Sequence, residues 1–207
     1  MLVKLYGIIL KMKLVVYIYN TKGVALEALL NNKYISELEK SSFEKYKDLE
    51  TKKEKIVSAI FKNKYVGQYH TNEFGKPLSN EKYFNVSHSK GYVAFVSDQV
   101  PVGIDIEKVR NAEEDLIKFI SSEKEKEYIH DNETFFEIWT NKEALVKAIG
   151  SGIKDKISSI PGLPINGIRV YEDKTFMNKT IRVDDFIITV SRQDNETFDL
   201  EVCKEVI

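Results

Sequence analysis

Residues 102–107 read Val-Gly-Ile-Asp-Ile-Glu, and this strict alternation of apolar and polar side chains has the period of a β-strand. Successive strand side chains point to opposite faces, so the three aliphatic residues predict a buried face, while Asp105 and Glu107 share the other. Two carboxylates at i and i+2 are about 7 Å apart at their Cα atoms, near enough to hold one hard cation jointly. Gly103 lies on the acidic face and is expected to leave space for something bulky. The alternative is an ordinary exposed strand face with two acidic residues.

The segment 136–150 has helical periodicity instead. Its apolar stripe consists of Phe135, Ile138, Leu145 and Ile149, flanked by Trp139 and Val146. Glu143 and Lys147 lie off this stripe at i and i+4, where the simplest interpretation is a surface ion pair that contributes about 0.3–0.5 kcal/mol. Lys142 falls within the stripe, so its ammonium must either reach the surface or find an anion.

The region before the acidic strand contains candidate phosphate contacts. Gly75 permits close approach of a ligand to the backbone, Pro77 stiffens the turn, and Lys76 between them is a fixed cation suited to a phosphate. At the end of the next predicted strand, Ser87 and His88 both carry groups that donate hydrogen bonds to phosphates. Adjacent strand residues point to opposite faces, which argues against Ser87 and His88 as a nucleophile and its base.

The whole chain divides into two halves of similar pattern. Strand-like runs cover residues 14–19, 83–87, 92–97, 102–107, 168–171, 186–191 and 198–203, and helical patterns cover 24–65 and 112–150. The turn at residues 98–101 separates the halves. This order predicts an α+β fold, with an N-terminal subdomain at residues 1–100 and a C-terminal subdomain at residues 101–207.

Composition narrows the class of partner and the compartment. The 31 basic and 32 acidic residues nearly cancel, which provides no global field for nucleic acid. One cysteine, Cys203, and three histidines disfavour a Cys/His zinc site and fit a reducing cytoplasm. Lysines interrupt the apolar run 2–19, so we interpret it as a strand rather than a signal peptide or membrane span. Met12 offers a second possible start.

Together, and in this order, four motifs resemble those of the 4′-phosphopantetheinyl transferase family. They are Gly-Lys-Pro at 75–77, Phe-Asn-Val-Ser-His-Ser at 84–89, Val-Gly-Ile-Asp-Ile-Glu at 102–107 and Trp-Thr-Asn-Lys-Glu-Ala-Leu-Val-Lys at 139–147. The resemblance covers residues 74–152 and is closest to the longer, monomeric branch typified by the surfactin-synthetase activator. The first half departs from the family, since it has lysines where relatives often carry an arginine-rich patch, and lysine is a less directional phosphate ligand.

The resemblance implies transfer of the phosphopantetheine group of coenzyme A to a serine of an acyl or peptidyl carrier protein, with release of 3′,5′-ADP. It also implies two similar α+β subdomains, packed as a pseudodimer with an active-site cleft between them. The expected cofactor is Mg²⁺, held by Asp105, Glu107 and Glu143. A cytoplasmic monomer that binds neither nucleic acid nor membranes is expected.

The family also implies roles for individual residues. The catalytic set is Glu143, Lys147 and Asp105, with Glu143 as the base for the acceptor serine and Lys147 as the stabiliser of the departing phosphate. The expected coenzyme A contacts are Gly75, Lys76, Pro77, Ser87, His88, Lys142 and Lys147, of which Gly75 and Pro77 shape the adenine end.

Two other classes of function remain open from the sequence. A magnesium-dependent nuclease or phosphohydrolase would use similar acidic residues, but it predicts a basic nucleic-acid track that the near-neutral charge does not suggest. A carrier-binding module without activity would bind carrier proteins and leave them unmodified, although the carboxylates and the helix lysine expected of an active enzyme are all present.

Overall fold

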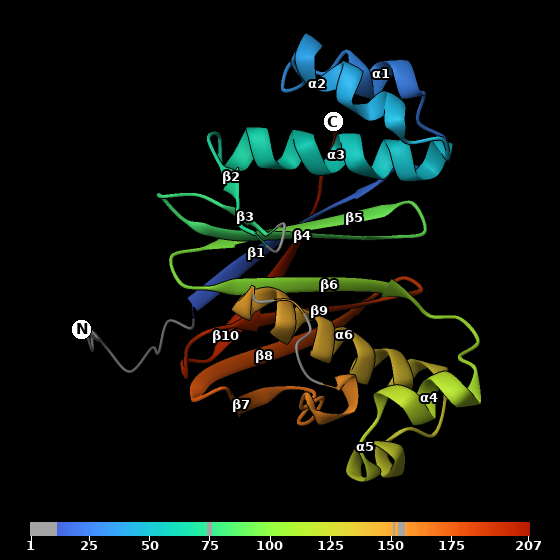
Figure 1. Ribbon diagram of the computed structural model, residues 1–207, viewed down its shortest axis with the longest axis vertical. Coiled ribbons are helices and arrows are strands. Elements are labelled where there is room, and N and C mark those ends of the chain that lie inside the picture. The colour runs from blue at the N-terminus through green and yellow to red at the C-terminus, as the bar shows by residue number, and fades with distance from the viewer. Residues whose placement is uncertain (1–11, 74–75, 151, 153–155) are drawn as a thin grey trace.

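The computed structural model describes residues 12–73, 76–150, 152 and 156–207 and contains four layers (Figure 1). A helix, α3 (Leu49–Tyr65), covers a first sheet; a second sheet packs beneath it; and α6 (Asn132–Ile149) covers the far face of the second sheet. Within these described residues no helix is long and apolar enough to cross a membrane.

The first sheet has the strand order β10-β1-β5-β4. Its strands are β1 (Met12–Asn20), β4 (Tyr83–Ser89), β5 (Tyr92–Asp98) and β10 (Phe198–Lys204). β1 pairs in parallel with β10, and the other pairings are antiparallel. Two short strands, β2 (His70–Thr71) and β3 (Pro77–Leu78), pair with each other beside it.

The second sheet is antiparallel, with the order β6-β9-β8-β7. Its strands are β6 (Val102–Lys108), β7 (Gly167–Tyr171), β8 (Lys174–Val183) and β9 (Phe186–Arg192). β4 and β6 are therefore edge strands of their respective sheets, and the two edges lie next to each other.

The two long helices, α3 and α6, begin at aspartate capping residues. The shorter ones are α1 (Leu26–Leu30), α2 (Glu37–Ser42), α4 (Glu114–Ile120) and α5 (Glu123–Tyr128), with 3₁₀ turns η1 (Phe43–Lys45) and η2 (Ile157–Ser159). The carboxylates of Asp48 and Asp131 accept backbone hydrogen bonds at the starts of α3 and α6. Gly150 ends α6 with a left-handed φ of 78°, which glycine adopts without strain.

Aliphatic side chains from both sheets form the central core. Val16 of β1, Val96 of β5 and Ile104 of β6 are fully buried in it. Separate clusters lie between the first sheet and α3 and between the second sheet and α6. The apolar positions predicted on β6 thus face the first sheet, whereas the acidic face of β6 lies toward α6.

The predicted mixed α+β architecture is confirmed, but the C-terminal strand lies in an unexpected place. β10 belongs to the first sheet and pairs with β1, although it is in the sequence half assigned to the second subdomain. Phe198 is buried in the central core, with Leu200 and Val202 packed against that core. Local periodicity identified this strand, but only non-local pairing decides which sheet it joins.

Gly103 corrects one expectation from the sequence. A Cβ atom at this position would lie 2.1 Å from the carbonyl oxygen of Ala144 and 2.4 Å from the backbone nitrogen of Ala148. The space beside Gly103 is therefore filled by the backbone of α6 rather than left open for a ligand. The missing side chain brings α6 into direct contact with β6.

Gly103→Ala is expected to destabilise the fold by about 3 kcal/mol, because the added methyl group meets backbone atoms that cannot rotate away. Urea unfolding measures this. Gly67→Ala is the matched control: its φ of 80° is strained but nothing lies within 4 Å, so the expected cost is about 1 kcal/mol. Equal losses in the two variants would contradict the close approach of α6 to β6.

Candidate active site at the junction of the two sheets

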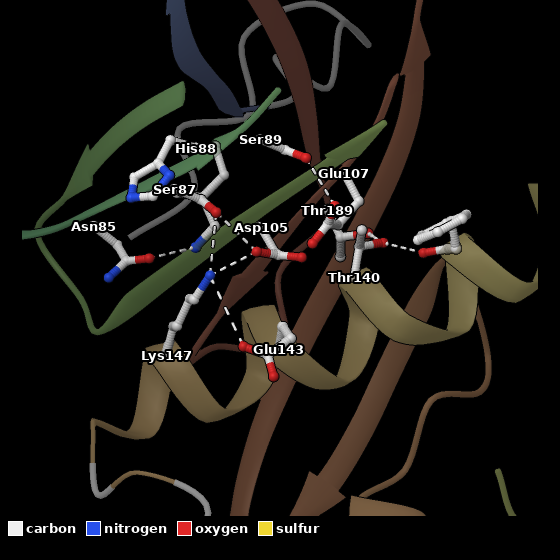
Figure 2. A network of polar contacts seen from close by, with 12 residues as sticks. Asn85, Ser87, His88, Ser89, Asp105, Glu107, Thr140, Glu143, Lys147 and Thr189 are labelled. Atoms are coloured by element: carbon white, nitrogen blue, oxygen red, sulfur yellow. Dashed lines mark hydrogen bonds and ion pairs between the residues drawn. The ribbon is translucent and has the colours of Figure 1, made fainter. Parts of the chain in front are cut away.

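Side chains of β4 reach across to β6 where the two sheet edges meet. The Oδ1 atom of Asn85 accepts a hydrogen bond of 3.0 Å from the backbone N–H of Ile104. The hydroxyl of Ser87 donates to Asp105 Oδ1 at 2.8 Å (Figure 2). These contacts satisfy backbone and side-chain groups that a sheet edge otherwise leaves unpaired.

The same pattern continues two residues further along β4. The hydroxyl of Ser89 donates to Glu107 Oε2 at 2.8 Å and accepts from the backbone N–H of Lys108 at 3.3 Å. We call the contacts of Asn85, Ser87 and Ser89 with β6 the polar seam. It fixes Asp105 and Glu107 of one sheet against the edge of the other.

Lys147 of α6 points at the seam. Its Nζ atom lies 2.6 Å from Asp105 Oδ1, 3.1 Å from Ser87 Oγ and 4.0 Å from Glu143 Oε2 (Figure 2). Glu143, one turn earlier on α6, faces the same way, as the i, i+4 spacing predicts. The structure therefore brings together Asp105, Glu107, Glu143 and Lys147, three carboxylates and one ammonium group from β6 and α6.

Asp105 and Glu143 are held where ionisation is unfavourable. Burial raises the pKa of Asp105, and the ion pair with Lys147 opposes that rise. Burial also raises the pKa of Glu143; Lys147 opposes this rise, and the negative charges of Asp105 and Glu107 add to it. The cluster thus carries an excess of negative charge that a further cation would stabilise.

A buried polar network sets the position of α6 on the second sheet. The hydroxyl of Thr140 lies 2.8 Å from that of Thr189 on β9, and Asn141 Nδ2 donates to Thr180 Oγ1 on β8 at 2.8 Å. Thr140 and Asn141 are fully buried. Because neither contact tolerates rotation of the helix, the network keeps Glu143 and Lys147 directed at Asp105.

Lys142 corrects a second expectation. It was predicted to hold a phosphate, but its side chain is completely buried, and Nζ lies 2.7 Å from Glu125 Oε2 and 3.1 Å from the carbonyl oxygen of Ile157. A lysine within the apolar stripe requires a nearby anion, and here that anion is the Glu125 carboxylate of α5. The ammonium group of Lys142 is therefore buried and already paired within the core.

His88 points to the opposite side of β4 from Ser87, as strand alternation predicts. It lies against α3, with Nδ1 3.0 Å from Glu54 Oε2 and Nε2 2.8 Å from Lys55 Nζ. It lines a cavity of about 340 Å³ between α3 and β4, together with Pro77 and several lysines and aromatic residues. A Ser87–His88 nucleophile pair is thereby excluded.

Lys76 lies at the other end of the site. Its ammonium group donates to the carbonyl oxygens of Lys147 and Ala148, at 2.7 and 2.8 Å. Lys76, Pro77 and Lys147 line a second cavity of about 260 Å³, formed by residues from both halves of the chain. The predicted contact Gly75 lies outside the described residues.

Sequence reasoning missed the structural role of the seam. Asn85 and Ser89 appeared only as parts of a motif, yet both hydrogen-bond to β6. The sequence did contain a sign of this role, since residues 85, 87 and 89 are all polar and alternate with the period of a strand, which places them on one face. Glu54 was missed because it comes from a distant helix.

The acidic residues are of the type that binds a hard divalent cation, but their side chains are not arranged around one point in this structure. Asp105 Oδ2 is buried and has no hydrogen-bond partner among the residues described, and carboxylates are preferred ligands of Mg²⁺. Over the same described residues, no three His, Cys, Asp or Glu side chains are grouped closely enough to hold a metal ion. Lys147 already pairs with Asp105 Oδ1, so Oδ2 is the oxygen of Asp105 that is left for a cation in this arrangement.

Comparison with known proteins agrees with this site. Residues 101–197, which include the acidic strand and α6, match the sequence model of the 4′-phosphopantetheinyl transferase superfamily. This segment of the chain is therefore similar to that superfamily, in line with the resemblance of its motifs.

The chain is similar to several proteins that are named 4′-phosphopantetheinyl transferases. The chain is 28% identical over 142 residues to the 4′-phosphopantetheinyl transferase gsp of Aneurinibacillus migulanus, covering 60% of each chain. It is 29% identical over 115 residues to 4′-phosphopantetheinyl transferase Sfp of Bacillus subtilis (51% of this chain, 49% of the relative). It is 32% identical over 100 residues to psf-1 of Bacillus pumilus (44% and 43%). The alignments span between 43% and 60% of each relative, so the similarity to these Sfp-like proteins covers only part of their length.

Glu143→Gln is expected to gain stability over the natural chain as pH rises in metal-free buffer. Because the pKa of folded Glu143 is raised, the unfolded chain ionises first, so folding weakens as pH rises from about 4.3 toward the folded pKa. Glutamine removes this loss. Urea unfolding of both chains at low and high pH measures the difference, and the exposed Glu127→Gln is the control. A Glu143→Gln variant whose free energy of unfolding falls relative to the natural chain as pH rises would contradict the electrostatic account.

Proposed function

We propose that this protein transfers the 4′-phosphopantetheine group of coenzyme A to a serine of an acyl or peptidyl carrier protein, releasing 3′,5′-ADP. The main support is the cluster of Asp105, Glu107, Glu143 and Lys147 at the sheet junction, inside the segment that matches the superfamily. Cavities lined by residues of both halves lie next to it. A cleft between two subdomains is a common place for such a ligand.

The proposed reaction is one displacement at phosphorus. The serine oxygen of the carrier attacks the phosphorus next to the pantetheine arm, a new P–O bond forms, and the bond to 3′,5′-ADP breaks. Glu143 accepts the serine proton, directly or through a water. Lys147 leaves Asp105 to neutralise the departing phosphate. No covalent enzyme intermediate is needed.

The phosphates of coenzyme A are proposed to bind along β4. Lys76 and Lys147 line the 260 Å³ cavity and His88 lines the 340 Å³ cavity, and these side chains are the proposed phosphate contacts. Ser87 accepts a hydrogen bond from Lys147 and donates its only hydroxyl hydrogen to Asp105, so a hydrogen bond from Ser87 to a phosphate requires that Ser87 first release Asp105. Pro77 lines both cavities and is proposed to shape the adenine end.

Mg²⁺ is the proposed cofactor, with Asp105, Glu107 and Glu143 as its protein ligands. When bound, Mg²⁺ neutralises charge on the pyrophosphate under attack. The residues themselves supply the ligand oxygens, and the seam holds two of the three carboxylates in place. A pseudodimer of two subdomains, divided near residue 100, together with a monomeric state and a cytoplasmic location, remains part of this proposal.

The direct test is incubation with coenzyme A, Mg²⁺ and a panel of unmodified carrier proteins, followed by intact mass spectrometry of the carriers. A gain of one phosphopantetheine group is expected with the natural chain and with Glu127→Gln. Glu143→Gln is expected to slow transfer on the order of a hundredfold or more, because a general base typically contributes that much. Coenzyme A binding without modification of any carrier would favour the carrier-binding module instead.

Metal dependence is tested separately by thermal unfolding. Mg²⁺ is expected to stabilise the natural chain in proportion to the logarithm of its concentration, and Asp105→Asn and Glu107→Gln are expected to abolish this gain. Coenzyme A added with Mg²⁺ is expected to raise the melting temperature further. Stabilisation by DNA or RNA rather than coenzyme A would contradict the transferase and favour a nuclease.

A further inference from the structure

Glu54 is a buried carboxylate that the proposed mechanism does not use. It lies on α3, its side chain is 9% exposed, and it faces the loop between β4 and β5. Oε1 accepts a hydrogen bond of 2.7 Å from the backbone N–H of Gly91, and Oε2 lies 3.0 Å from Nδ1 of His88. Burial opposes ionisation of Glu54, but the hydrogen bonds from His88 and Gly91 outweigh it and lower the pKa.

The partners of His88 determine where its hydrogen resides. A carboxylate only accepts hydrogen bonds, so Nδ1 must donate to Glu54. The ammonium group of Lys55 only donates, so Nε2, 2.8 Å from Lys55 Nζ, must accept. The ring is thus held with its hydrogen on Nδ1, while Nε2 lies beside Lys55 on the 340 Å³ cavity that both residues line.

We propose that Glu54 is a positioning residue of the coenzyme A site, which orients the His88 imidazole so that Nε2 faces the cavity where a phosphate binds. The inference rests on the proposed function for the identity of that ligand. A phosphate oxygen only accepts hydrogen bonds, so a hydrogen bond from Nε2 to a phosphate uses the doubly protonated ring, in which Nδ1 still donates to Glu54. Lys55 then turns from the ring to the phosphate.

The natural protein provides the first measurement. Nitrogen-15 NMR at about pH 9, where imidazole is neutral, is expected to show His88 with its hydrogen on Nδ1. The His88→Gln variant assigns the signal. A hydrogen on Nε2 would overturn the proposal, and this result does not depend on activity.

The variant Glu54→Gln provides the second. Gly91 and His88 contact different oxygens of Glu54, and an amide replaces one of them with a nitrogen that only donates, so glutamine cannot reproduce both contacts. We expect the preference for Nδ1 to be lost and KM for coenzyme A to rise on the order of tenfold, with kcat within about twofold. Glu50→Gln is the matched control. Glu50 lies one turn earlier on α3, and both Glu50 and Glu54 line a third cavity, of about 850 Å³. Glu50 contacts Lys53 and Thr21 rather than His88. Its KM is expected to stay within about twofold of the natural value.

A double-mutant cycle separates positioning from simple structural support. If Glu54 acts through His88, Glu54→Gln adds no further rise in KM to His88→Gln. A full, additive rise in the double variant would overturn the proposal, as would an unchanged KM in Glu54→Gln alone. Failure of the natural chain to bind coenzyme A by calorimetry would instead overturn the proposed function, and with it the phosphate role of His88.

Discussion

The structure depends on how two sheet edges are joined without a backbone ladder between them. β4 and β6 are both edge strands, and their exposed N–H and C=O groups would invite pairing with another chain if they were left open. Asn85, Ser87 and Ser89 close this junction with side chains instead. Side chains hold the strands apart more than backbone pairing would, and the acidic residues of β6 occupy the junction that results.

The charges of the site follow from this arrangement. Asp105 is 4% exposed, and such burial of a carboxylate is costly unless it is paired and hydrogen-bonded. Ser87 and Lys147 provide these partners at Oδ1, but Oδ2 has none among the residues that the structure describes. The same ammonium group therefore stabilises the resting fold and, in the proposed reaction, the leaving phosphate. The absence of a side chain at Gly103 is what allows α6 to approach closely enough for Lys147 to reach the seam.

The sequence was most informative where periodicity and chemistry coincide. Alternation located β6 and its two acidic residues, and the i, i+4 spacing placed Glu143 and Lys147 on one face of α6. It failed where contacts join distant segments. β8 went unrecognised because Lys174, Lys179 and Arg182 interrupt its apolar pattern, and nothing local to Lys142 indicated Glu125 as its partner. The three polar residues of the seam alternate with the period of a strand in the sequence. Their role in joining the sheets, however, can be recognised only once β6 is known to lie opposite β4.

The central claim is that side chains of β4 hold the second sheet in place, and hydrogen exchange at a single amide tests it most directly. The N–H of Ile104 donates to Asn85 Oδ1, so it is predicted to exchange slowly in the natural protein and to lose protection in Asn85→Ala, while amides within the β8–β9 pairing keep theirs. Slow exchange at Ile104 that persists in Asn85→Ala would show that something other than the polar seam closes the junction, and would contradict this account of the site.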